Sequence, residues 1–162
     1  MKRRKAVLSV LLLAAMVMAA APVSAEEKAA DNMQIVLEKI RSDKKLLVAE
    51  NMQLSEAEAK SFWPVYERYQ DELFLIRART MNLIKEYEES YEKLTDDIAR
   101  KLLDESIEIE ALRLKLIQAY LPKFREVLPD KKVARYYQLE NKVQAALMYE
   151  LARNIPLAKT DG

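Results

Sequence analysis

Cysteine and histidine are both absent from this chain of 162 residues. Without cysteine, the chain can form no disulfide and can carry no lipid on an amino-terminal cysteine. Without histidine, it has no imidazole to bind a metal ion, to serve in a Ser-His-Asp or Cys-His catalytic group, or to act as a pH switch. We therefore expect no metal site, and we expect packing alone to hold the fold together.

Glycine occurs once, as the last residue, Gly162. The glycine-rich loops that bind phosphates in nucleotide and dinucleotide sites are therefore missing, and we expect no cofactor. Turns that require a positive φ angle are disfavoured as well, which argues against β-hairpins. These absences leave a single all-α domain as the expected fold.

The first 25 residues have the three zones of a secretory signal peptide. Four basic residues, Lys2 to Lys5, precede an apolar run from Ala6 to Ala21, and the small residues Val23-Ser24-Ala25 form a cleavage site. The apolar run has 16 residues, whereas a membrane-spanning helix needs roughly 20. We therefore expect cleavage after Ala25, rather than a membrane anchor, and export of the remaining 137 residues.

The charge of the chain gives no indication of nucleic acid as a partner. Cleavage of the leader removes four of the 27 basic residues and none of the 26 acidic ones, so the mature chain has a net charge of −3. Nucleic-acid-binding domains carry an excess of positive charge instead. The carboxylates of Glu105, Glu108 and Glu110 are close enough in sequence to act in pairs, but a charge run on a long helix is typical of a solvated face. We expect no enzyme.

The clearest periodic signal lies between Leu54 and Tyr91. Mostly apolar side chains recur there at alternating steps of four and three residues, which is a heptad seam. The pattern predicts a helix from Glu56 to Tyr91, roughly 54 Å long at 1.5 Å per residue. The seam consists of Phe62, Tyr66, Tyr69, Leu73, Ile76, Thr80, Leu83 and Tyr87.

Local signals predict how this helix begins and where it bends. Ser55 and Glu58 have the spacing of a capping box, in which each side chain binds the backbone amide of the other residue. Pro64 lies in the third turn, where it removes one helical hydrogen bond and is expected to kink the helix.

Two more helices are expected on either side of this one. The first covers residues 31–52 with Asp31 as its cap, after a disordered tail at residues 26–30. The other begins after the cap residue Thr95 and is kinked or ended by Pro122.

A last helix is expected to begin with Pro129 at its first position and to end near Arg153, before a flexible tail at residues 156–162. The sequence thus predicts an all-α fold for residues 31–155. We expect an elongated antiparallel hairpin or bundle of about four helices, with long, kinked central helices.

Two apolar stripes run along the third helix, about 100° apart on a helical wheel. A helix in a simple hairpin needs only one stripe, so the second must meet another helix of the same chain, a second protomer or a client protein. The first stripe consists of Ile98, Leu102, Ile109, Leu112, Leu116 and Ala119. The second consists of Leu103, Ile107, Leu114, Ile117, Leu121 and Phe124.

The second stripe is the predicted partner-binding surface, and Trp63, Phe74 and Met81 on the preceding helix are candidate additions to it. For Trp63 the alternative is an aromatic plug at the end of the bundle, formed with Phe62 and Tyr66.

Two charged residues interrupt the apolar faces. Glu140 falls inside the apolar face of the last helix, and Arg113 falls between the two stripes of the third. We predict that they pair across a helix interface, because a buried charge without a partner is costly. Alternatively, both side chains extend to the rim of the interface.

Two helix starts in this chain resemble a known motif. The segments Leu54-Ser55-Glu56-Ala57-Glu58 and Leu94-Thr95-Asp96-Asp97-Ile98 lie 40 residues apart. With the leader, the mature length and the lack of cysteine, they resemble the Spy/CpxP family of periplasmic stress proteins, whose hallmark is Leu-Thr-x-x-Gln occurring twice. Glu58 and Ile98 stand at the glutamine position, and the resemblance covers residues 34–149.

This resemblance implies a periplasmic cradle of long antiparallel helices, usually a dimer, that binds unfolded or aggregating envelope proteins without ATP. Some members of the family inhibit a sensor kinase, and none has a catalytic residue. Metal-binding relatives use histidine and cysteine ligands, which this chain lacks.

The leading hypothesis is a periplasmic, ATP-independent chaperone or holdase that acts as a homodimer. Its excess apolar stripe would hold many clients weakly, because hydrophobic contact is not directional. One alternative is an inhibitor or adaptor module for an envelope stress sensor. Another is a purely structural helical oligomer, in which the second stripe forms the dimer contact.

Overall fold

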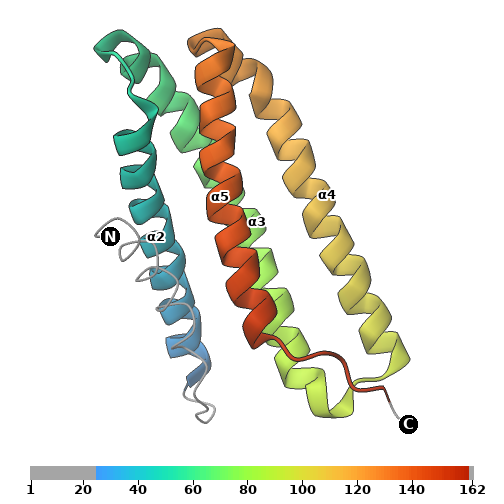
Figure 1. The fold of residues 1–162 in the computed structure, drawn as a ribbon. Coiled ribbons are helices and arrows are strands. Elements are labelled where there is room, and N and C mark those ends of the chain that lie inside the picture. Colours follow the sequence, from blue (N-terminus) through green and yellow to red (C-terminus); the bar gives the residue numbers. More distant parts are fainter. Residues whose placement is uncertain (1–24, 161–162) are drawn as a thin grey trace. The chain divides into compact units, whose positions relative to one another are not determined.

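The structure is a computed structural model that describes the backbone of residues 25–160 and the side chains of residues 38–160. Residues 1–24, which are all but the last residue of the expected leader, and the last two residues lie outside the described part of the chain. The described residues form four α-helices, one short 3₁₀ helix and no strand, so the all-α prediction is confirmed. The elements in order are α2 (Ala25–Met52), α3 (Glu56–Ser90), η1 (Tyr91–Lys93), α4 (Asp96–Val127) and α5 (Asp130–Asn154) (Figure 1).

The helices belong to two compact units. Among the described residues, the α2/α5 unit comprises α2 and Gln53 together with Ala134–Asn154. The α3/α4 unit comprises Leu54–Val133 together with the tail that begins at Ile155. All of the predicted partner-binding residues lie in the α3/α4 unit.

Helix α2 starts earlier than the sequence indicated. It begins at Ala25, so residues 26–30, which we expected to be a disordered tail, are helical, and Asp31 lies inside the helix rather than at its cap. The segment Glu-Glu-Lys-Ala-Ala has high helix propensity, and acidic residues are stabilised in a first turn. The helix ends before Gln53, whose φ angle of 50° lies in the left-handed region that glycine usually occupies at a helix end.

The capping box predicted at the start of α3 is confirmed. The Glu58 amide donates to Oγ of Ser55 at 3.3 Å, and the Ser55 amide donates to Oε2 of Glu58 at 2.8 Å. Lys132 also binds Oε2 of Glu58 at 2.5 Å. The hydrogen bond from Lys132, followed by the one from the Ser55 amide, lowers the pKa of Glu58.

The starts of α4 and α5 follow the predicted residues closely. Thr95 caps α4, because its hydroxyl accepts a hydrogen bond from the Ile98 amide at 3.3 Å. Pro129 lies directly before α5 rather than at its first position, and its carbonyl accepts the first helical hydrogen bond, from Val133 at 3.0 Å. Helix α4 continues through Pro122 to Val127, so this proline does not end the helix.

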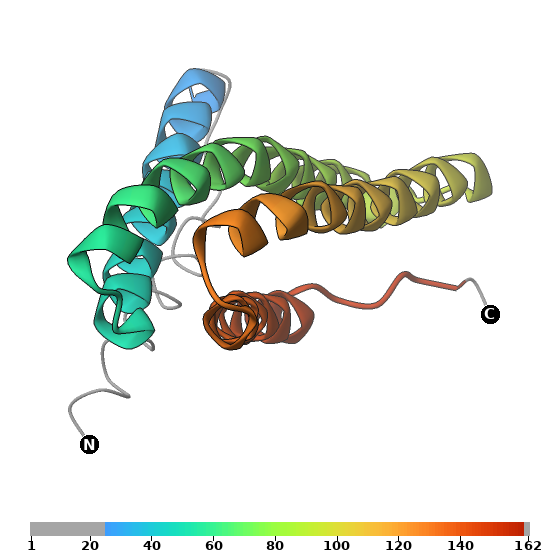
Figure 2. The ribbon, with the colours of Figure 1, turned by 90° about the horizontal axis from the view of Figure 1, so that it is seen from above.

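Helices α3 and α4 lie side by side and run in opposite directions, with η1 at the turn between them (Figures 1 and 2). An aromatic cluster joins the two helices. The ring centroids of Tyr69 and Tyr120 are 5.4 Å apart, and Phe124 lies 5.8 Å from both Phe62 and Tyr69. Each of these four side chains is at most 3% exposed. Such ring pairs contribute about 0.5–1.5 kcal/mol each beyond their buried area.

Two residues of this cluster correct the predicted stripes on α4. Phe124, assigned to the partner-binding surface, is fully buried, and Tyr120, which belonged to neither stripe, is 3% exposed. The buried face of α4 continues from Leu116 in steps of four residues, and positions four apart lie on the same side of a helix. Tyr120 also donates a hydrogen bond to Glu72, and burial, followed by this bond, raises the pKa of Tyr120 to about 12.

The heptad seam on α3 is buried only in its first half. Phe62, Tyr66, Tyr69 and Leu73 are buried, but the later seam residues Ile76, Thr80, Leu83 and Tyr87 are only half-buried. Arg77 and Ile84, each one position further along the chain, are buried in their place. A straight helix drifts by about 20° per heptad relative to a strict seven-residue repeat, or about 60° over three heptads, which turns the buried face toward the following residue.

The α2/α5 unit contains a buried ion pair. Nζ of Lys44 binds Oε2 of Glu140 at 2.6 Å, and the two side chains are 1% and 6% exposed. The interpretation that Glu140 needs a buried partner is therefore correct, but the partner is Lys44. The predicted partner, Arg113, lies on α4 in the other unit and takes no part in this pair. Burial and then the charge of Glu140 raise the pKa of Tyr137 to about 12.

Removing one member of this pair should destabilise the protein strongly. Lys44→Met leaves the Glu140 carboxylate buried without this cation, and such a change costs about 3–5 kcal/mol of unfolding free energy. The double variant Lys44→Met, Glu140→Leu should recover most of that loss, because neither charge of the pair remains. Urea denaturation of the three proteins measures both effects.

Lys39→Met is the matched control, since Lys39 pairs with Asp43 on the same helix at 2.7 Å but is exposed. An exposed pair contributes about 0–1 kcal/mol. Equal losses for the Lys39 and Lys44 variants would show that burial does not govern the Lys44–Glu140 pair.

Candidate functional site

Three large apolar side chains project from α4 into solvent. Leu103 and Ile107 are each 61% exposed, and Leu114 is 55% exposed. Ile117 and Leu121 follow at helical spacing and are half-buried. These five residues form the α4 strip, which lies roughly 100° around the helix from the buried face. In the part of the chain that the structure describes, three of the six residues of the predicted second stripe are therefore exposed.

The candidate additions from α3 are less exposed than the α4 strip. Trp63, Phe74 and Met81 are all half-buried. The indole ring of Trp63 lies edge-on to Phe62 at 5.1 Å and to Tyr66 at 5.2 Å. These contacts favour the aromatic plug that we considered as the alternative for Trp63.

Charged and polar side chains flank the α4 strip. Asp104, Glu108, Lys115 and Gln118 are exposed on the same helix. Such flanks keep an apolar strip soluble. Glu110 is exposed within the strip, and Arg113 is half-buried beside it.

The sequence pattern did not predict the exposure of several other apolar residues. Leu75 on α3 is 65% exposed, and in the other unit Leu46 on α2 and Tyr149 on α5 are 62% and 63% exposed. Leu75 lies outside the heptad seam of α3, and that off-seam position is the signal that could have identified it. Leu46 and Tyr149 sit on helices with a less regular pattern, where exposure cannot be inferred from spacing.

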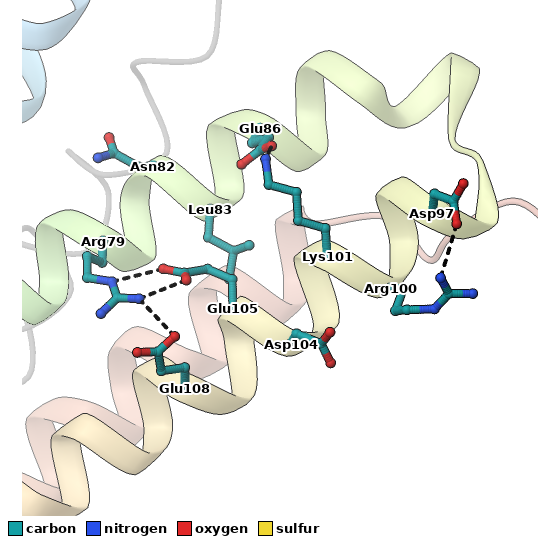
Figure 3. A pocket seen from close by; sticks show the side chains of 10 residues that line it. All are labelled: Arg79, Asn82, Leu83, Glu86, Asp97, Arg100, Lys101, Asp104, Glu105 and Glu108. Carbon is teal, nitrogen blue, oxygen red and sulfur yellow. Dashed lines mark hydrogen bonds and ion pairs between the residues drawn. The ribbon is translucent and has the colours of Figure 1, made fainter.

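An open groove of about 570 Å³ runs between α3 and α4 near their η1 end (Figure 3). Three basic and five acidic residues line it. Arg79 from α3 reaches across to Glu105 on α4 with two hydrogen bonds, of 2.9 and 2.8 Å, and to Glu108 at 3.4 Å (Figure 3). The first of these interactions, hydrogen bonding from Arg79, lowers the pKa of Glu105.

Further ion pairs in the groove join Lys101 to Glu86 and Arg100 to Asp97 (Figure 3). The groove pairs four of its five carboxylates with cations, and its geometry fits a clamp that joins α3 to α4. Glu105, expected on a solvated face, belongs to this clamp.

The described residues contain no group of three or more carboxylate side chains placed to hold a metal ion. Among the same residues, no helix is long and apolar enough to cross a membrane.

Compared with protein-family models, with curated proteins and with solved structures, the chain matches none.

The α4 strip should bind a hydrophobic dye without contributing to stability. Replacing Leu103, Ile107 and Leu114 together by serine should remove most of the dye fluorescence, while the free energy of unfolding changes by about 0.5 kcal/mol or less per site. Leu102→Ala or Leu116→Ala, on the buried face of the same helix, should cost about 2–5 kcal/mol each. Dye titration and urea denaturation measure the two effects, and unchanged dye binding in the serine variant would contradict this assignment.

Proposed function

We propose that the protein is a periplasmic, ATP-independent holdase that binds unfolded envelope proteins through the α4 strip. The observation that carries the proposal is the exposure of Leu103, Ile107 and Leu114, each more than half exposed on one face of α4. An uncovered apolar stripe of this kind is typical of a surface that meets another polypeptide.

The physical chemistry of the α4 strip suits weak binding to many clients. Burial of apolar surface contributes about 25 cal/mol per Å² and has no preferred direction. A strip one helix wide offers limited area, so individual clients would bind and leave readily. The clamp of Arg79, Glu105 and Glu108 supports the proposal, because it holds α4 against α3 while the strip stays accessible.

The resemblance to the Spy/CpxP family supports the same function, and the expected leader supports export. The proposal also includes helix bends at Pro64 and Pro122 and an elongated hairpin arrangement of the helices. It also includes supporting contacts from Phe74 and Met81, whose side chains remain partly accessible.

An aggregation assay tests the proposal. The mature chain, at near-stoichiometric amounts, should suppress the aggregation of two unrelated, chemically unfolded proteins, as measured by light scattering. Leu114→Asp, Ile117→Asp should lose most of this protection, because charged side chains cannot bury apolar client segments without a desolvation penalty.

The matched control is Ala111→Asp, Ala119→Asp, which adds the same charge to exposed positions of the same helix outside the α4 strip. Protection should persist in this control. Equal protection by both double variants, with both folded by circular dichroism, would remove the α4 strip from the mechanism. Suppression of neither client would favour the adaptor for a single envelope sensor instead.

A second candidate is a homodimer in which α4 pairs with α4 of another copy, and the spacing within the strip favours it. Leu103 and Leu121 each lie nine residues from position 112, Ile107 and Ile117 five, and Glu110 and Leu114 two. In an antiparallel pair centred on that position, each of these residues meets its counterpart in the partner helix.

The charges also fit this pairing. Glu110 of one copy would then lie next to Leu114 and Arg113 of the other copy. The Glu110 carboxylate and the Arg113 guanidinium would neutralise each other across the interface. The α4 strip would in this case serve as a structural contact.

Cysteine crosslinking tests the pairing without background, because the chain has no cysteine of its own. Leu103→Cys mixed with Leu121→Cys should form a disulfide-linked dimer, visible by non-reducing electrophoresis. Leu103→Cys alone should not, since its two copies would lie about 27 Å apart along an antiparallel pair. The reverse result would indicate parallel pairing, and absence of any crosslink in the mixture would eliminate the dimer through α4.

A further inference from the structure

The tail that follows α5 contacts the α3/α4 unit. Residues 155–160 have no helical structure and lie in the same unit as α3 and α4. Oη of Tyr87, in the last turn of α3, donates a hydrogen bond to the carbonyl of Pro156 at 2.9 Å. At the other end of this segment, Lys159 forms an ion pair with Glu92 in η1.

Tyr91, which lies between Tyr87 and Glu92 in the sequence, makes a third contact with the tail. Nζ of Lys159 lies 4.9 Å from the centroid of the Tyr91 ring, within the range of a cation–π interaction. The rings of Tyr87 and Tyr91 pack edge-on, with centroids 5.8 Å apart and an interplanar angle of 66°. The hydroxyl of Tyr87, the ring of Tyr91 and the carboxylate of Glu92, spaced over six consecutive positions, thus contact the tail.

The spacing of the receiving residues matches an extended peptide. Tyr87 and Glu92 are separated by about 7.5 Å along a helix axis. Pro156 and Lys159 are separated by about 9 Å in an extended or polyproline conformation. The tail is thus held through a backbone carbonyl at Pro156 and through the side chain of Lys159, as extended peptides are often held by main-chain hydrogen bonds and by sites for particular side chains. Leu157 between the two contacts is 90% exposed, so it contributes little to the fit.

We propose that Tyr87, Tyr91 and Glu92 form a binding site for an extended peptide segment that carries a lysine three residues after the carbonyl that Tyr87 binds. The chain's own tail occupies this site in the free protein and competes in cis with such segments of other polypeptides. The site is separate from the α4 strip, and it requires neither a holdase activity nor a dimer.

The individual contacts are of a strength that permits exchange. The side chains of Lys159 and Glu92 are 49% and 74% exposed, and an ion pair of this kind changes affinity by only about two- to fivefold. A tethered ligand nevertheless has an effective concentration on the order of millimolar, so the tail excludes weak ligands from solution. Weakening the tail should therefore make the site accessible to a peptide in trans.

A binding experiment on the full chain tests this inference. The probe is a fluorescent peptide with the sequence of residues 154–160, Asn-Ile-Pro-Leu-Ala-Lys-Thr. Fluorescence anisotropy should show about fivefold tighter binding to the Lys159→Glu chain than to the unaltered chain, because the ion pair is lost, the introduced carboxylate is repelled by Glu92 and the tail is released. A peptide with glutamate in place of its lysine should bind neither chain.

Two further variants control for effects other than competition. Glu92→Lys combined with Lys159→Glu restores an ion pair of reversed sign, so the tail should return and the lysine peptide should be excluded again. Tyr87→Phe combined with Lys159→Glu keeps the ring but removes the hydroxyl donor, and it should weaken peptide binding about fivefold.

Circular dichroism checks that each variant is folded. Failure of the peptide to bind the Lys159→Glu chain up to millimolar concentration would overturn the inference. So would equal binding to the unaltered, Lys159→Glu and charge-reversed chains, since no competition by the tail would then exist.

Discussion

The geometry of a two-helix contact limits how much of α4 the α3/α4 unit can cover. One neighbouring helix shields one stripe of a helix surface, and α3 covers the stripe that contains Leu102, Ile109, Leu116, Tyr120 and Phe124. Apolar residues continue further around the helix, where Leu103, Ile107 and Leu114 meet solvent. Both functions argued for the α4 strip follow from this mismatch between the apolar circumference of α4 and the single neighbour within its unit.

The two units are held by different physical means. In the α3/α4 unit, rings from both helices form one cluster, and the clamp of Arg79 to Glu105 and Glu108 fixes the two helices at the other end. The α2/α5 unit instead buries a charged pair, Lys44 and Glu140. Buried ion pairs contribute modestly to net stability, but they penalise any arrangement that separates the partners. A chain without disulfides thus relies on packed rings in the α3/α4 unit. In the α2/α5 unit, the buried ion pair accompanies the buried apolar residues Ile40, Val48, Met52 and Tyr136.

Local signals in the sequence predicted more of this structure than long-range ones did. The capping box of Ser55 and Glu58 and the cap at Thr95 involve residues within one turn, and both form as expected. The assignment of Phe124 to the partner-binding surface is wrong because the buried residues near the end of α4 follow one another in steps of four. These steps turn the buried face toward Phe124, away from the predicted first stripe. Lys44 was missed as the partner of Glu140, since 96 residues separate them and no spacing rule connects two helices so far apart. The Arg79 clamp was missed for the same reason.

The position of Trp63 has a practical consequence for following each unit of this protein. It is the only tryptophan in the chain, and it packs against Phe62 and Tyr66 in the α3/α4 unit. Its intrinsic emission therefore responds to the packing of that unit, whereas the far-ultraviolet ellipticity sums over all helices. The two optical signals together resolve the melting of one half of the molecule from that of the other, with no added label.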